Sequence, residues 1–203
     1  MPVVEADDFT RDSLLRLFEE RGALLSGHFL LSSGLHSSRY LQCARVLMDP
    51  SLATRLGGAL AARLRPLLGG VAPRAVVAPA LGGVLVAHEV ARALGCIGLF
   101  TERQDGAMTL RRGFVLEALE PVVVVEDVIT TGGSTREVLD AVKARGASVL
   151  AVGSLVDRSG GTVDLGVPYR SLLELVVEAY PAEACPLCAQ GSLPEKPGSR
   201  TPR

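Results

Sequence analysis

Four short runs of consecutive apolar residues constrain the fold of this 203-residue chain more than any other feature. The runs cover residues 75–78, 96–101, 121–125 and 148–156. Helical patterns over residues 83–94 and 134–145 separate them, and each pattern ends at a glycine. Continuous apolar strands between helices are typical of a parallel sheet that is buried on both faces. The sequence therefore predicts an α/β fold with a mostly parallel central sheet flanked by helices.

The rest of the chain predicts one domain over residues 1–180. An amphipathic helix is expected over 8–21, β-like runs over 24–48, and a helix that begins at Asp49-Pro50 and ends near Leu64. Residues 181–203 are rich in proline, glycine, serine and charge, which indicates a loosely held tail.

Composition narrows the class of protein. Lys and Arg number 21 against 22 Asp and Glu, so the chain has no basic excess for nucleic acid. The most apolar stretch, residues 75–87, is interrupted by a proline and two glycines and is too short to cross a membrane. The acidic start does not resemble a signal peptide, and four scattered cysteines suggest reduced thiols. We therefore expect a cytoplasmic protein without nucleic-acid or membrane partners.

One segment carries most of the functional signal, because two carboxylates and a hydroxyl-glycine loop follow the valine-rich run. Its residues are Glu126, Asp127, Val128, Ile129, Thr130, Thr131, Gly132, Gly133, Ser134 and Thr135. Glycines allow successive backbone N–H groups to point at one anion, and the hydroxyls and the N-terminus of the next helix add favourable partners. The loop is thus predicted to bind a phosphate.

The two carboxylates need different partners, since a phosphate would repel them. Glu126 and Asp127 suit hydroxyl donors or a hydrated cation beside the phosphate. A monophosphate, vicinal hydroxyls and a metal together describe a ribose 5-phosphate. The competing interpretation is an ordinary capped strand-to-helix turn. The sequence contains neither a G-x-x-x-x-G-K-[ST] nucleotide loop nor a G-x-G-x-x-G dinucleotide loop.

The segment that begins at Glu126 resembles the 5-phosphoribosyl 1-diphosphate (PRPP) signature of type I phosphoribosyltransferases, in the form found in orotate phosphoribosyltransferases. Three further segments, 27–34, 79–83 and 155–158, resemble the base-site segment, the pyrophosphate loop and the strand end that carries an orotate-binding arginine. The resemblance implies the type I fold with a small N-terminal hood over about residues 1–48. It also implies transfer of phosphoribose from PRPP to orotate in pyrimidine biosynthesis. The protein would be a homodimer. Mg²⁺ would be held mainly by substrate and water, without a direct protein ligand.

The resemblance also implies roles for individual residues. Glu126 and Asp127 would accept hydrogen bonds from the ribose hydroxyls, and they are the expected catalytic residues together with Arg103. Orotate would be bound by Thr130 and by the planar guanidinium of Arg158. The expected PRPP contacts are Glu126, Asp127, Val128, Ile129, Thr130, Thr131, Gly132, Gly133, Ser134, Leu81, Gly82, Gly83 and Arg103.

Residues 101–114 lie where the family has a mobile loop over the active site. Arg103 is the expected pyrophosphate contact, whereas Arg111 and Arg112 could equally be solvated charges on a hairpin. Two positions depart from the family: Glu102 stands where a basic residue is expected, and Ser32 stands where the base segment has a lysine.

The cysteines and histidines do not form a recognisable metal motif in the sequence. Cys185 and Cys188 make a half-site for zinc at most, which two chains could combine, and free thiols are the favoured interpretation. The three histidines, His28, His36 and His88, share no spacing that suggests a ligand cluster. Two alternative functions remain open: transfer to a purine base, and a non-catalytic regulator that binds PRPP or a nucleotide.

Overall fold

A six-stranded sheet forms the centre of the computed structural model, which describes residues 9–31 and 33–197. The strands lie in the order β5-β4-β3-β6-β7-β8, and neighbours are parallel except for the antiparallel pair β4–β5. Their bounds are β3 Ala75–Pro79, β4 Ile97–Gln104, β5 Ala107–Leu110, β6 Pro121–Ile129, β7 Ser148–Asp157 and β8 Tyr169–Glu174. The predicted mostly parallel α/β sheet is confirmed.

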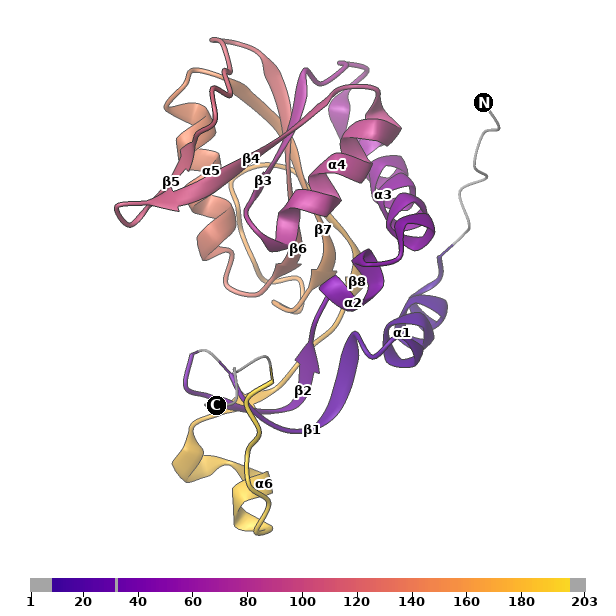
Figure 1. The fold of residues 1–203 in the computed structure, drawn as a ribbon, viewed down its shortest axis with the longest axis vertical. Helices are drawn as coiled ribbons and strands as arrows, with labels where there is room; N and C mark the ends of the chain where they lie inside the picture. Colours follow the sequence, from indigo (N-terminus) through magenta and orange to yellow (C-terminus); the bar gives the residue numbers. More distant parts are fainter. Residues whose placement is uncertain (1–8, 32, 198–203) are drawn as a thin grey trace.

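Helices cover both faces of this sheet (Figure 1). They are α3 Pro50–Leu64, which continues into the 3₁₀ turn η1 Arg65–Leu68, α4 Gly82–Leu94 and α5 Gly133–Lys143. Alternate valines of β6 pack on opposite sides. Val123 and Val125 belong to the same buried cluster as α3 and α4, whereas Val122 and Val124 belong to the cluster that contains α5 residues. A strand buried on both faces explains the unbroken valine run.

A smaller antiparallel sheet forms the N-terminal hood. It consists of β1 Leu24–Leu30, β2 His36–Leu41 and β9 Ala179–Tyr180, in that order. The helices α1 Arg11–Glu20 and α2 Ala44–Leu47 join the hood to the main domain, and the Thr10 hydroxyl caps α1. Figure 1 shows the hood beside one end of the large sheet, with the last part of the chain returning to it.

Several boundaries differ from the sequence-based expectation. Strand β6 continues to Ile129 instead of ending at Val125, so the two carboxylates lie within the strand. The strands β5, β8 and β9 lie outside the four predicted runs, because short strands with polar residues give little periodic signal. The helix expected to begin near Ser134 begins at Gly133.

The segment after Pro181, which its composition indicates to be loosely held, contacts the hood. It contains the 3₁₀ turn η2 Ala182–Ala184 and the short helix α6 Pro186–Ala189. Glu195 exchanges backbone hydrogen bonds with β1, donating to the His28 carbonyl at 2.8 Å and accepting from the Leu30 N–H at 2.7 Å. Among the described residues, no helix combines the length and the apolar character that crossing a membrane requires.

Candidate active site

The acidic pair lies where the sheet opens. Strand β3 pairs with β6 only as far as Val77, which lies opposite Val124, and the chain then continues past Pro79 towards α4. Beyond Val124, the only described strand that pairs with β6 is β7, so Glu126 and Asp127 lie beside the gap that the departing chain leaves. In α/β sheets, ligands bind at such openings at the carboxyl ends of strands.

Burial raises the pKa of both carboxyl groups of this pair. Glu126 is 7% exposed, and burial followed by the nearby Asp127 charge raises the pKa of its carboxyl to about 9. Burial also raises the pKa of Asp127, against the opposing effect of the Val128 N–H, which donates to Asp127 Oδ1 at 2.9 Å. Two carboxyl groups held in this way gain from a ligand that donates hydrogen bonds or carries positive charge.

The loop between β3 and α4 lies against the acidic pair. A Cβ on Gly82 would be 2.6 Å from Asp127 Oδ2, and one on Gly83 would be 2.7 Å from the Ala78 Cβ. The Ala80–Leu81 peptide bond is cis, and Leu81 is 88% exposed. The structure thus brings the predicted pyrophosphate loop and the predicted ribose-binding carboxylates together.

The hydroxyl-glycine loop lines an open cavity of about 140 Å³ at the start of α5. Its lining residues are Glu126, Val128, Ile129, Thr130, Thr131, Gly132, Gly133, Ser134 and Thr135. Gly132 has a φ of +78°, and a Cβ there would lie 2.9 Å from Val163 Cγ2, so the turn requires glycine. The Arg136 guanidinium braces the loop by donating to the Thr131 carbonyl at 2.6 Å and the Asp164 carbonyl at 2.8 Å. The loop is therefore held open as a cavity of phosphate size.

Arg158 follows the end of β7, next to the strand that carries the acidic pair. Its backbone N–H donates to the Ile129 carbonyl at 2.7 Å, which fixes its position relative to β6. Its Nε is buried and has no hydrogen-bond partner within the described residues, and burial lowers the pKa of the guanidinium. A buried guanidinium nitrogen without a partner is suited to an anionic ligand.

Arg103 lies on the β4–β5 hairpin, which projects from the edge of the sheet beside α5 (Figure 1). Its NH2 group is 2.7 Å from Glu137 Oε2 on α5, and its NH1 group donates to the Gly106 carbonyl at 2.6 Å. The predicted contact with pyrophosphate stays a prediction, and in this structure the guanidinium is paired with Glu137.

The unexpected Glu102 has a partner on the same hairpin. Its two oxygens accept from Arg112 Nε and NH2, both at 2.9 Å, and the Arg112 guanidinium also lies over the Phe100 ring at 5.7 Å. This bidentate pair explains why an acidic residue is accommodated at position 102. Ser32, the other departure from the family, lies outside the described residues.

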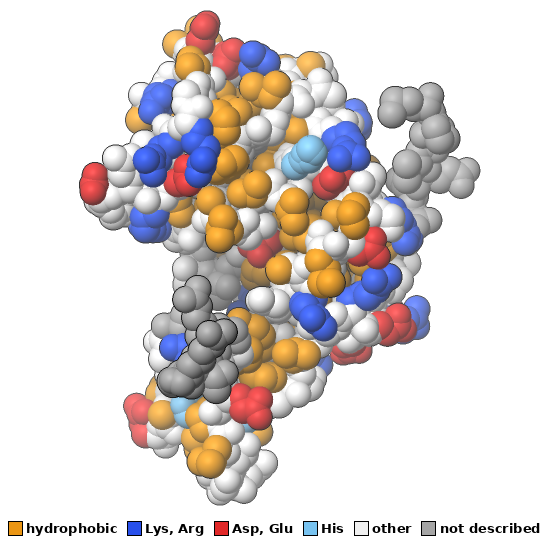
Figure 2. Space-filling model, in the orientation of Figure 1, with side chains coloured by type: hydrophobic (Ala, Val, Ile, Leu, Met, Phe, Trp, Pro, Cys, Tyr) orange, Lys and Arg blue, Asp and Glu red, His pale blue; other side chains and the backbone are white. Residues whose placement is uncertain are grey.

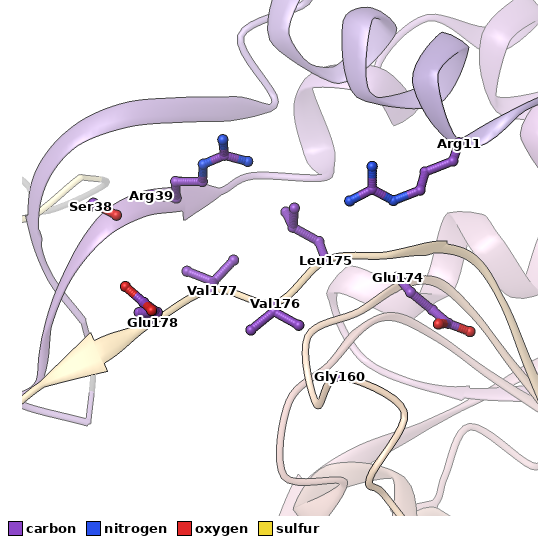
Figure 3. A pocket seen from close by; sticks show the side chains of 9 residues that line it. All are labelled: Arg11, Ser38, Arg39, Gly160, Glu174, Leu175, Val176, Val177 and Glu178. Atoms are coloured by element: carbon purple, nitrogen blue, oxygen red, sulfur yellow. The ribbon is translucent and has the colours of Figure 1, made fainter.

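A separate cavity of about 640 Å³ lies between the hood and the main domain. Figure 3 shows Arg11 and Arg39 on one side of the link that joins β8 to β9, with Val176 directed away from them. Glu174 and Glu178 also line it, so the cavity combines both signs of charge. The predicted PRPP and orotate contacts do not line this cavity, whereas several of them line the smaller one.

The structure brings two of the three histidines to the two C-terminal cysteines, which their spacing along the chain does not indicate. His28 and His36 lie beside Cys185 and Cys188 of the same chain, and one ligand atom from each of the four residues lies within 4.8 Å of the others. The sequence could not show this cluster, because 152 positions separate His36 from Cys188 and strand pairing brings them together.

Comparison with known proteins identifies the family. A model of the phosphoribosyl transferase domain matches residues 52–181. The orotate phosphoribosyltransferase of Heliobacterium modesticaldum is 54% identical over 192 residues, which cover 95% of this chain and 100% of the relative. The chain belongs to the orotate phosphoribosyltransferase family.

Other members of the family agree with this result. The orotate phosphoribosyltransferase of Thermotoga maritima is 53% identical over 193 residues, covering 91% of this chain and 96% of the relative. The crystal structure of orotate phosphoribosyltransferase from Aeropyrum pernix has a TM-score of 0.63 and 29% identity, and the match covers 80% of this chain and 93% of that one. The fold and most of the chain length are thus shared with these enzymes.

Proposed function

We propose that this chain transfers the 5-phosphoribosyl group from PRPP to orotate, giving orotidine 5-phosphate and pyrophosphate in pyrimidine biosynthesis. The observation that carries the proposal is the buried pair Glu126–Asp127 beside a phosphate-sized cavity, in a chain 54% identical to an orotate phosphoribosyltransferase over nearly its whole length. The division into a domain over 1–180 and a tail over 181–203 stays a prediction.

The acidic pair binds the ribose in this proposal. The 2- and 3-hydroxyls of PRPP form hydrogen bonds with the carboxyl groups of Glu126 and Asp127, while the 5-phosphate lies in the loop from Thr130 to Ser134. The N–H groups at the start of α5 face the phosphate, because the first turn of a helix leaves its donors without internal partners. Anchoring both ends of the sugar orients C1 towards the incoming base.

Orotate binding is assigned to Arg158 and Thr130. The Arg158 guanidinium pairs with the orotate carboxylate, and the position of Arg158 beside Ile129 brings that carboxylate close to the phosphoribose. Orotate N1 then forms a bond to C1 and releases its proton to solvent, while the C1–O bond breaks and its electron pair leaves with pyrophosphate. The chain needs no covalent nucleophile for this step, because it positions the two reactants.

The leaving pyrophosphate requires hydrogen-bond donors and positive charge. Backbone N–H groups of Leu81, Gly82 and Gly83 lie at the start of α4, where helix donors lack internal partners. Arg103 adds a cation once it leaves Glu137. Together they stabilise the negative charge that grows on pyrophosphate.

Magnesium fits the donor set of this site. The carboxyl oxygens of Glu126 and Asp127 are the hard donors that Mg²⁺ prefers, and the charge of Asp127 contributes to the raised pKa of Glu126, so a nearby cation would relieve repulsion between them. When bound with PRPP, Mg²⁺ supplies charge neutralisation for the pyrophosphate and the ribose oxygens. Substrate and water provide most of its ligands in this proposal.

We further propose that the protein is a cytoplasmic homodimer. Figure 2 shows hydrophobic side chains gathered over α4 and β4, and an apolar cavity of about 710 Å³ lies there. Leu85, which lines this cavity, is 47% exposed, which suits a contact with a second copy. Sedimentation velocity should therefore show twice the mass of the chain.

The proposal is tested by a panel of bases. Orotate, uracil, adenine, hypoxanthine and xanthine are each mixed with the protein, PRPP and Mg²⁺, and pyrophosphate release is measured. Of the five bases, we expect only orotate to give pyrophosphate release. Release with a purine instead would identify a different base, and PRPP binding without release with any base would identify a regulator.

A further inference from the structure

Four potential metal ligands meet at the outer end of the hood. His36 Nδ1 lies 3.0 Å from His28 Nε2 and 3.3 Å from Cys188 Sγ. His28 Nε2 lies 3.5 Å from Cys185 Sγ and 3.8 Å from Cys188 Sγ. Each of the four residues thus directs a nitrogen or sulfur atom at one shared point.

The fold explains how distant residues come together. His28 and His36 lie on the paired strands β1 and β2, and β9 pairs with β2 so that Tyr180 lies opposite His36. The chain then turns through η2 and places Cys185 and Cys188 at either end of a C-x-x-C turn. Two strands and the segment that follows a third therefore build the cluster.

The spacing matches a zinc tetrahedron. Zinc–nitrogen bonds of about 2.0 Å and zinc–sulfur bonds of about 2.3 Å give ligand-to-ligand distances of roughly 3.3–3.8 Å. Four of the six distances between the ligand atoms run from 3.0 to 3.8 Å, and all six lie within 4.8 Å. A zinc ion would lengthen the His28–His36 contact slightly and hold all four ligand atoms within its coordination sphere.

Burial and charge also suit zinc. His28 and His36 are each 6% exposed, Cys185 is 2% exposed and Cys188 is half-buried, so three of the four ligands are shielded from water. Two thiolates and two neutral imidazoles balance the charge of Zn²⁺, which avoids a net buried charge. His28 Nδ1 lies 3.2 Å from Ser192 Oγ, a contact that leaves Nε2 to face the cluster.

We propose that His28, His36, Cys185 and Cys188 bind one structural zinc ion. Four protein ligands leave no open position for a substrate, so the ion is structural. It ties the segment around α6 to β1, next to the hydrogen bonds that Glu195 makes with His28 and Leu30. Zinc thus fixes the last part of the chain to the hood.

The test measures metal in the full-length protein. Reduced, purified protein is incubated with Zn²⁺ and desalted, and its zinc content is measured by inductively coupled plasma mass spectrometry. Cys188→Ala is measured in the same way. The control is Cys96→Ala, because Cys96 lies outside the cluster. We expect about one zinc per chain in the wild type and the control, and a loss of most of it in Cys188→Ala. Cobalt substitution should give the absorption of a tetrahedral site with thiolate ligands.

Two results would overturn the proposal. One is a reduced wild-type protein that retains no zinc after desalting. The other is full zinc retention by Cys188→Ala. Because the wild-type measurement needs no variant, a failure of Cys188→Ala to fold does not affect it.

Discussion

Gly82 and Asp127 lie so close that a single added carbon would collide with the carboxylate: a Cβ on Gly82 would be 2.6 Å from Asp127 Oδ2. The contact joins the first turn of α4 to the end of β6. It places the predicted pyrophosphate loop against the predicted ribose site, and the geometry of one depends on the other.

Substitution of Gly82 tests this dependence. Gly82→Ala should displace the Asp127 carboxylate and lower kcat/KM by about 100-fold, since misplacement by about 1 Å can cost that much. Steady-state kinetics with PRPP and orotate measure the loss. The matched control is Gly58→Ala in α3, where a Cβ meets nothing within 4 Å. It should keep full activity and gain up to about 1 kcal/mol in unfolding free energy.

The charge of Asp127 is tested by Asp127→Asn. Loss of a charge-assisted hydrogen bond to a ribose hydroxyl should lower turnover by about 10- to 100-fold, while circular dichroism shows an unchanged fold. Asp140→Asn, an exposed change on α5, serves as the control. Turnover close to that of the wild type in Asp127→Asn would remove the carboxylate from the mechanism.

The raised pKa of Glu126 predicts a pH dependence of stability. The folded protein keeps a proton on Glu126 up to a pKa of about 9, whereas the unfolded chain releases it near 4.5, the ordinary pKa of a glutamate. The unfolding free energy should therefore fall as pH rises from about 4.5 to about 9. Glu126→Gln should make the unfolding free energy depend less on pH, as measured by thermal unfolding across that range. An unchanged pH dependence would contradict the raised pKa of Glu126.

Arg158 should affect the base more than PRPP. Arg158→Ala removes the guanidinium expected to pair with orotate, so the KM for orotate should rise by at least about 10-fold while the KM for PRPP changes little. Arg170→Ala, at an exposed position on β8, should leave both constants unchanged. If Arg158→Ala changed both KM values equally, Arg158 would support the structure of the site and would not bind orotate specifically.

The central sheet and the acidic pair could be predicted from the sequence because both depend on local patterns. The valine run of β6 requires burial on both faces, and the Glu126–Asp127 pair shortly precedes the hydroxyl-glycine loop. The ends of strands were harder to predict. Strand β6 continues to Ile129, but the polar residues Glu126 and Asp127 interrupt the apolar pattern after Val125.

Long-range contacts could not be predicted in the same way. The His28–Cys188 approach depends on the return of β9 to the hood, and the Arg103–Glu137 pair depends on how the hairpin packs beside α5. Neither spacing along the chain nor residue type specifies such contacts, because they arise from tertiary packing.

The most direct test is a crystal structure of the protein with PRPP and Mg²⁺. The account predicts the 5-phosphate in the loop from Thr130 to Ser134 and the ribose hydroxyls on Glu126 and Asp127. A structure in which PRPP is bound elsewhere while that loop holds no phosphate would contradict it.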